Sequence, residues 1–126
     1  MYQVVLFSDI FRPLHGKGMG VYRLANHLRV NNYTVQVVHG FIKLSDSDFF
    51  DICKQVISDT TLVVGLGATV MADLEQGLFF GMDPDQVKNR FKKIKQQWPH
   101  VQLALGGAQV TGATDDYLQS FDYFDY

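Results

Sequence analysis

Four short apolar runs, separated by segments of helical periodicity, constrain the fold of this chain more than any other feature. The runs are YQVVLF at 2–7, YTVQVVH at 33–39, TLVVGLG at 61–67 and VQLALGG at 101–107. Each is rich in β-branched and apolar residues, which is typical of strands that are buried on both faces. We therefore expect a parallel sheet with helices on both sides.

The segments between these runs have the periodicity and the start signals of amphipathic helices. Ser45, with Asp48 three residues later, resembles a capping box in which Asp replaces Glu or Gln, and Asp83 followed by Pro84 is a strong helix start. Asn31 and Asn32 are suitable residues for ending the first helix. The apolar stripes of the three helices are Val21, Leu24, Ala25 and Leu28, then Phe49, Ile52, Cys53, Val56 and Ile57, then Val87, Phe91, Ile94 and Trp98.

Alternation of strands and helices predicts a doubly wound α/β domain, Rossmann-like or flavodoxin-like, with a parallel sheet of about five strands. TDDYLQSF at 114–121 is expected to form a short helix, and DYFDY at 122–126 begins to resemble a fifth strand.

All 126 residues fit one domain. The last run looks short for a strand, which favours the N-terminal part of a longer protein. Segment 70–82 is compatible with a helical turn or with an apolar loop.

Composition excludes several classes of function. The formal net charge of −2 argues against a nucleic-acid partner, and we interpret the basic residues within 88–97 as the solvated side of a helix. A single cysteine, Cys53, excludes an internal disulfide, a thiolate zinc site and an iron–sulfur cluster. It favours a reducing compartment, and we expect a cytoplasmic protein. The segment MYQVVLFSD is neither a signal peptide nor a membrane span.

Three of the four runs lead into loops that contain glycine: HGKGMG at 15–20, GLGATVM at 65–71 and GGAQVTGA at 106–113. Any one of them can be a simple turn. The carboxyl ends of parallel strands meet at one edge of the sheet, however, and ligands of open α/β sheets bind there. Together the loops predict a rim that is poor in side chains, against which a large flat ligand can lie.

Several more specific ligand-binding and catalytic motifs are absent or incomplete in this sequence. Gly16, Gly18 and Gly20 give G-x-G-x-G, which lacks the last glycine of the dinucleotide fingerprint. Lys17 is not followed by Ser or Thr, so no phosphate-binding loop is present. The third run has no terminal Asp for a phosphoacceptor, and no G-x-S-x-G elbow occurs. The histidines, His15, His27, His39 and His100, have no metal-binding spacing.

The stretch PLHGKGMGVYRLANHLRVNNYTVQVVH, followed by VVGLGAT and VQLALGGAQVT, resembles the cobalamin-binding domain. More narrowly, it is similar to the version that precedes the core of radical S-adenosylmethionine enzymes. The resemblance lies in the spacing and the residue types of these stretches, and it covers essentially the whole chain. The Asp-x-His-x-x-Gly motif of classical cobalamin proteins is absent, because Asp9 and His15 are six residues apart. Relatives in radical enzymes frequently lack it too.

The resemblance implies a module that holds cobalamin for a radical S-adenosylmethionine catalytic domain, in the same longer chain or separate. The three-cysteine cluster motif of such a catalytic domain cannot be built with Cys53 alone, so this chain would have no catalytic residue of its own. The backbone of residues 15–20 would approach the nucleotide tail, whose phosphate Lys17 or Arg23 is suited to neutralise. Residues 106–108 would let the lower face of the corrin pack on bare backbone. The implied contacts are His15, Gly16, Lys17, Gly18, Gly20, Ala68, Thr69, Gly106, Gly107 and Ala108, with no metal-ligating side chain.

Two other hypotheses stay open. The first is a non-catalytic interaction domain that has kept the fold and lost the ligand, for which the apolar segment GLFFGM at 77–82 would be the docking patch. The second is an enzyme that uses a nucleotide at the same edge, which the failed motifs disfavour.

Overall fold

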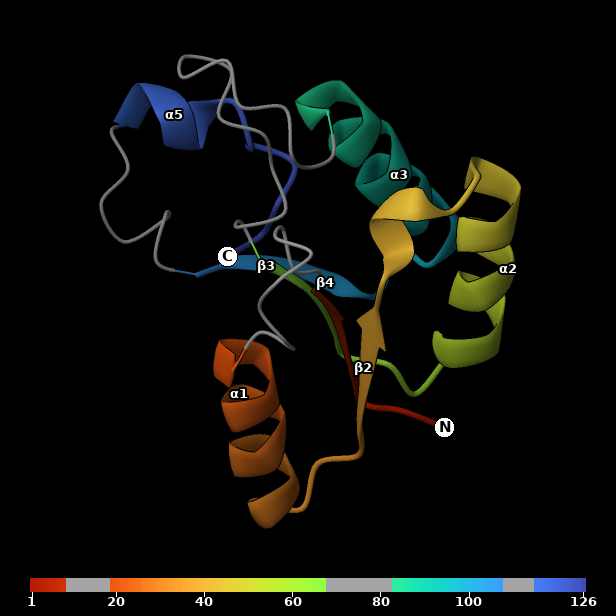
Figure 1. Cartoon of the computed structure of the whole chain (residues 1–126), viewed down its shortest axis with the longest axis vertical. Coiled ribbons are helices and arrows are strands. Elements are labelled where there is room, and N and C mark those ends of the chain that lie inside the picture. Colours follow the sequence, from red (N-terminus) through yellow and green to blue (C-terminus); the bar gives the residue numbers. More distant parts are fainter. Residues whose placement is uncertain (9–18, 68–82, 108–114) are drawn as a thin grey trace.

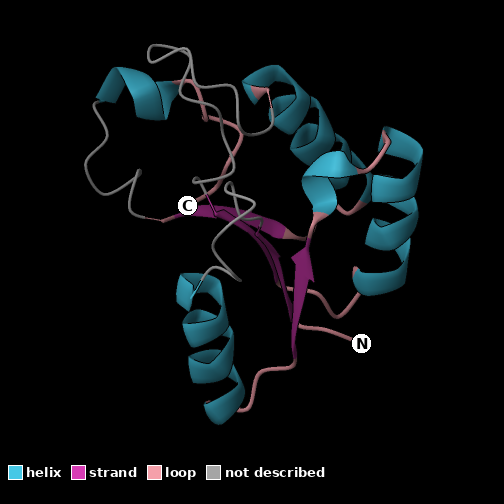
Figure 2. Cartoon of the chain, viewed as in Figure 1, coloured by secondary structure: helices cyan, strands magenta, loops and turns pink. Residues whose placement is uncertain are grey.

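The computed structural model describes residues 1–8, 19–67, 83–107 and 115–126. Its strands form one parallel sheet in the order β2-β1-β3-β4, with helices on both faces (Figures 1 and 2). The doubly wound α/β fold is thereby confirmed, with four strands rather than about five. The elements are β1 (Val4–Ser8), α1 (Met19–Val30), β2 (Val35–His39), the 3₁₀ helix η1 (Phe41–Lys43), α2 (Asp46–Val56), β3 (Val63–Gly67), α3 (Pro84–Gln97), β4 (Gln102–Gly106) and α5 (Asp115–Gln119).

The segment expected to form a fifth strand is not a strand, but its last residue pairs with β4. Tyr126 N–H donates to the Leu103 carbonyl oxygen at 3.1 Å, and Leu105 N–H donates to the Tyr126 carbonyl oxygen at 2.8 Å. This is the bonding pattern of neighbouring parallel strands. The short helix predicted just before it is α5.

The predicted helix boundaries follow from capping. The Ser45 hydroxyl accepts a hydrogen bond from Asp48 N–H at 3.1 Å and donates to the Asp48 carboxylate at 2.7 Å. At the start of α3, the Asp83 side chain accepts from Asp85 N–H at 2.8 Å. After α1 the chain reverses at Asn32, whose φ of 66° is in the left-handed region that Asn tolerates.

The larger hydrophobic core lies between the sheet and helices α2 and α3. Its centre is Phe7, whose ring lies 5.4 Å from that of Phe41, 5.3 Å from that of Phe49 and 5.9 Å from that of Phe91, centroid to centroid. Cys53 is fully buried in this core, as its place in the apolar stripe predicts. This face of the sheet therefore carries the larger core.

The opposite face is covered unevenly. Helix α1 packs on β1 and β2, where Ala25 is buried against Val4, Leu6 and Val35, and Figure 1 shows α1 on the side of the sheet away from α2 and α3. The helical stripe predicts that Leu24 is packed, but 48% of its surface is exposed. Among the described helices, none covers β3 and β4 on this face, so Leu24 borders open space.

Candidate functional site

A cavity of about 630 Å³ lies between α1 and the sheet and extends to the carboxyl ends of β1, β3 and β4. Its volume is typical of sites for small molecules, which are about 300–1,000 Å³. It occupies the edge at which open α/β sheets bind ligands. The lining residues are Val4, Leu6, Phe7, Ser8, Gly20, Val21, Leu24, Leu28, Val63, Gly65, Leu66, Gly67, Ala104, Leu105, Gly106 and Gly107.

The floor of the cavity is a strip of small residues on two neighbouring strands. Alternate residues of a strand point to the same face, and Val64 and Leu66 are buried in the core beneath the sheet. Gly65 and Gly67 of β3 therefore face α1. Gly65 lies opposite Ala104, and Gly67 lies opposite Gly106, in the parallel register. The Leu6 side chain extends over Gly65, so bare backbone remains at Gly67 and Gly106, where a flat group can pack closely.

Helix α1 supplies the opposite wall. Val21, Leu24 and Leu28 line it, and Gly20 stands in the first turn of the helix. That turn contains no acidic residue. The unpaired N–H groups at the start of a helix attract anions, so a phosphate at this edge would meet favourable electrostatics.

The structure brings together three of the residues implicated by the sequence. Gly20, Gly106 and Gly107 all line the cavity. A Cβ at Gly20 or at Gly106 would meet no described atom within 4 Å, whereas Gly107 has a φ of 114°, which side chains rarely adopt. The remaining candidates lie outside the described residues: His15, Gly16, Lys17, Gly18, Ala68, Thr69 and Ala108, together with the apolar segment 77–82.

Sequence reasoning missed Ser8, Gly65 and Ala104. Ser8 is the last residue of β1, only 6% of it is exposed, and it lines the cavity. A period-two signal was available in the sequence, because VVGLG and QLALG each place small residues at alternate positions. As turn formers after the strands, the same glycines point only to loops, whereas in the structure Gly65 and Gly67 belong to the face of β3.

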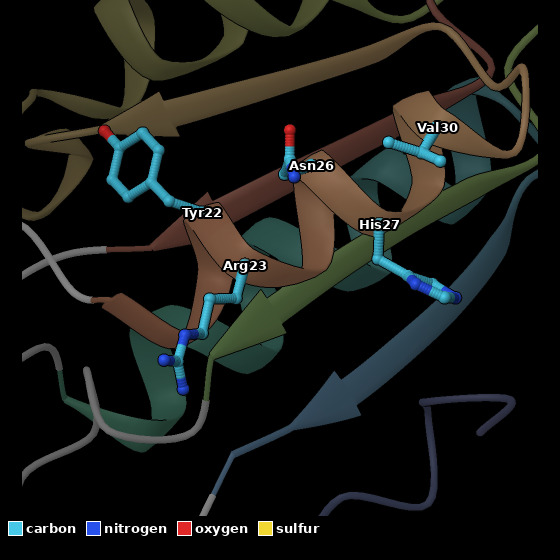
Figure 3. A pocket seen from close by; sticks show the side chains of 5 residues that line it. All are labelled: Tyr22, Arg23, Asn26, His27 and Val30. Carbon is cyan, nitrogen blue, oxygen red and sulfur yellow. The ribbon is translucent and has the colours of Figure 1, made fainter.

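A second hollow, of about 420 Å³, lies on the outer side of α1. Figure 3 shows its five side chains, with Arg23 and His27 extending on the side of β3 and β4 and Tyr22 on the side of β2. Asn26 and Val30 complete it. All five belong to one helix, so the hollow has a single wall and no opposing surface to hold a ligand.

The described residues contain neither a reactive thiol nor a metal-binding cluster. Burial raises the pKa of the Cys53 thiol to about 12, partly offset by the charge of Arg90, so a thiolate is not available at neutral pH. No group of three or more His, Cys, Asp or Glu side chains in the described ranges could hold a metal ion. Among the same residues, no helix has the length and apolar character needed to cross a membrane.

Comparison with protein families, with curated proteins and with solved structures finds no match to this chain.

Proposed function

We propose that this domain is a corrinoid-binding module that holds cobalamin for a separate radical S-adenosylmethionine catalytic domain. The observation that carries the proposal is the cavity between α1 and the strip of small residues on β3 and β4. It opens at the edge of the sheet where the first, third and fourth strands end.

The shape of the cavity fits part of a corrinoid and not the whole. A volume of about 630 Å³ suits a group of drug-like size, whereas the corrin macrocycle is much larger. The flat base of the nucleotide tail would enter between α1 and the floor made by Ala104 and Gly106, beside the Leu6 side chain that extends over Gly65. The macrocycle would then lie outside, at the carboxyl edge, near Gly107.

The tail phosphate has a favourable place at the start of α1. The first turn has no acidic side chain, and its backbone N–H groups can donate to an anion. Arg23 is exposed on the flank of α1 toward β3 and β4 (Figure 3), where its guanidinium can approach a phosphate at the mouth of the cavity.

Cobalamin would supply the cobalt–carbon chemistry, for methyl transfer or radical rearrangement, and the protein would supply binding and orientation. The chain itself would hold the tail and leave one face of the macrocycle accessible to the catalytic domain. In this proposal no side chain of the domain acts as an acid, a base or a nucleophile.

The test is retention of hydroxocobalamin through gel filtration by the purified protein. We expect the protein to remain red and the visible spectrum to shift toward a base-off form, because a tail base held in the cavity cannot coordinate cobalt. A colourless protein would favour the interaction domain without ligand.

A pair of bulky variants locates the site. Gly106→Leu places its side chain in the open space of the cavity and should abolish retention. Asn26→Leu places the same side chain on the outer face of α1 and should retain the cofactor as the wild type does (Figure 3). Equal retention by the two variants would contradict this site.

A further inference from the structure

β4 is an edge strand, and β3 is its neighbour in the order of the described strands. Gln102 N–H donates to the Leu62 carbonyl oxygen, next to β3, at 2.9 Å. The backbone groups of alternate residues in a strand point to opposite sides, so those of Val101, Leu103 and Leu105 face away from β3. An edge of this kind is a template for pairing with a strand of another chain.

The sequence of β4 gives this edge no protection of its own. Residues 101–106 read VQLALG and contain neither proline nor a charged residue, which are the residues that prevent pairing at natural edge strands. Two copies of such a strand can meet without repulsion between like charges. Protection of this edge must therefore come from other parts of the chain.

The last two residues of the chain block the middle of the edge, and Figure 1 shows the C-terminus beside β4. The Asp125 carboxylate accepts from Leu103 N–H at 2.8 Å, and Asp125 N–H donates to the Leu103 carbonyl oxygen at 2.8 Å. Leu105 N–H donates to the Tyr126 carbonyl oxygen at 2.8 Å. Both outward-facing groups of Leu103 and the outward-facing N–H of Leu105 are thus occupied.

Lys95 of α3 completes this cover and holds it in place. Its ammonium group donates to the Val101 carbonyl oxygen at 2.7 Å and to the Asp125 carboxylate at 2.8 Å. Only 33% of the Lys95 side chain and 32% of the Asp125 side chain are exposed, so salt screens this pair less than a fully exposed one. Lys95, Asp125 and Tyr126 together form the edge cover of β4.

The opposite edge of the sheet, at β2, is blocked only in part. The Arg29 guanidinium donates to the Val35 carbonyl oxygen at 2.8 Å, and the Gln36 side-chain amide donates to the Val37 carbonyl oxygen at 2.9 Å. The Val37 N–H faces away from β1 and has no partner among the described residues. It serves as an internal reference for an open edge amide.

We propose that the edge of β4 is a latent interface for the same edge of a second copy of this chain, which the edge cover keeps closed. With the cover removed, Leu103 of one copy would exchange backbone hydrogen bonds with Leu105 of the other in an antiparallel pair. Such a two-fold contact is self-complementary, because each copy presents the same donors and acceptors. The interface is independent of any ligand in the cavity.

Amide hydrogen exchange in the wild type tests the edge cover directly. The Leu103 and Leu105 amides should exchange at least about tenfold more slowly than the Val37 amide, the difference that one hydrogen bond makes. Equal rates would show that the edge of β4 is already open and would overturn the proposal.

Removal of residues 125–126 should open the interface. By sedimentation equilibrium, the truncated protein should dimerise with an association constant at least about tenfold above that of the wild type, because several hydrogen bonds form across the two edges. The Leu103 and Leu105 amides should be protected in the dimer and should exchange as fast as Val37 after dilution to the monomer. Asp125→Asn is the matched control. Its amide oxygen can still accept from Leu103 N–H, so it should associate no more than the wild type does.

A second variant keeps the full chain length, in case the truncated protein does not fold. Asp125→Pro combined with Tyr126→Pro removes the carboxylate and both N–H groups that donate to the Leu103 carbonyl oxygen, and it should dimerise in the same way. Urea unfolding establishes whether each variant is folded.

Three outcomes would overturn the latent interface. The first is a folded variant that associates no more than the wild type does. The second is association in which the Leu103 and Leu105 amides exchange freely, because the contact would then lie elsewhere on the molecule. The third is loss of folding in both variants, which would make residues 125–126 a part of the core and not a cover.

Discussion

Leu6 of β1 lies opposite Gly65 of β3, and the Leu6 side chain occupies the space that a side chain at position 65 would need. A Cβ at Gly65 would lie 2.8 Å from Leu6 Cδ2, well inside the usual 3.5–4.0 Å separation of carbon atoms. Glycine at this position therefore allows the Leu6 side chain to extend over β3, and no side chain of residue 65 projects into the cavity.

This relationship predicts that the effect of Gly65→Ala depends on Leu6. In the wild type the added methyl group should lower the free energy of unfolding by about 1 kcal/mol, since overpacking exceeds the entropic gain from replacing glycine. In a Leu6→Val background, which removes the conflicting Cδ2, the same change should be neutral or stabilising. Urea unfolding of the four proteins measures the coupling. An identical cost in both backgrounds would refute the contact.

Gly106 and Gly107 are adjacent in sequence and differ in what they require. Gly107 has a φ of 114°, so Gly107→Ala should lower the free energy of unfolding by about 1–2 kcal/mol through backbone strain. At Gly106 φ is not in the left-handed region and a Cβ meets no described atom. Gly106→Ala should therefore be neutral or stabilising by up to about 1 kcal/mol. Thermal or urea unfolding of the pair checks this, and equal losses would contradict it.

The same difference decides where a ligand-blocking change should be placed. A bulky residue at Gly107 would combine backbone strain with obstruction, so a lost ligand could not be assigned to either. At Gly106 the obstruction acts alone.

Much of the fold could be predicted from the sequence, because periodicity and caps are local signals. The buried runs, the Ser45 cap and the left-handed Asn32 all follow from short-range rules, and the structure confirms them. The exposure of Leu24 could not be predicted, because a helical stripe does not indicate whether neighbouring elements cover all of its residues.

For the candidate site, the sequence indicated the edge at which the cavity opens and only part of the cavity wall. Gly20, Gly106 and Gly107 were identified as loop glycines. Ser8 and Ala104 were missed, because their role depends on which strands are neighbours. The order β2-β1-β3-β4 is a long-range property, and no local pattern states it.

Arg90 joins three elements on the covered face of the sheet. Its guanidinium is 1% exposed, donates to Asp46 at the start of α2 and to the Leu44 carbonyl oxygen after η1, and lies 4.6 Å from the centre of the Phe49 ring. A buried cation requires a partner of opposite charge, and Asp46 is the carboxylate that the described structure gives it.

Asp46→Asn should therefore lower the free energy of unfolding by about 1–3 kcal/mol, the cost of weakening a charged hydrogen bond to a buried group. Asp51→Asn, which removes an exposed pair with Lys54, should change it by less than about 0.5 kcal/mol. In an Arg90→Met background the cost of Asp46→Asn should shrink, since only its effect at the start of α2 remains. Urea unfolding measures all of these variants. An undiminished cost in that background would show that Asp46 does not act through Arg90.

Asp125 ties the C-terminal residues to β4. Its carboxylate accepts from Lys95 Nζ at 2.8 Å and from Leu103 N–H at 2.8 Å. The hydrogen bond from the Lys95 side chain, followed by that from the Leu103 backbone, holds the pKa of Asp125 below its ordinary value. Because the pKa is lower in the folded state, the ionised form binds these partners better than the protonated form does.

The stabilisation from Asp125 is therefore fully present above the pKa of the unfolded chain and is lost as pH falls through the lower pKa of the folded state. Asp125→Asn should lower the free energy of unfolding at pH 7 by up to about 1 kcal/mol, as for a partly exposed pair. The difference from the wild type should shrink in acid, as the pH falls through the lowered pKa of Asp125 and its side chain becomes neutral. Asp122→Asn, at an exposed position nearby, is the control and should change little at either pH. Urea unfolding at the two pH values gives both differences. A deficit in Asp125→Asn that stays the same in acid would mean that the Asp125 charge makes no contribution, and that the amide is simply a poorer fit against Leu103.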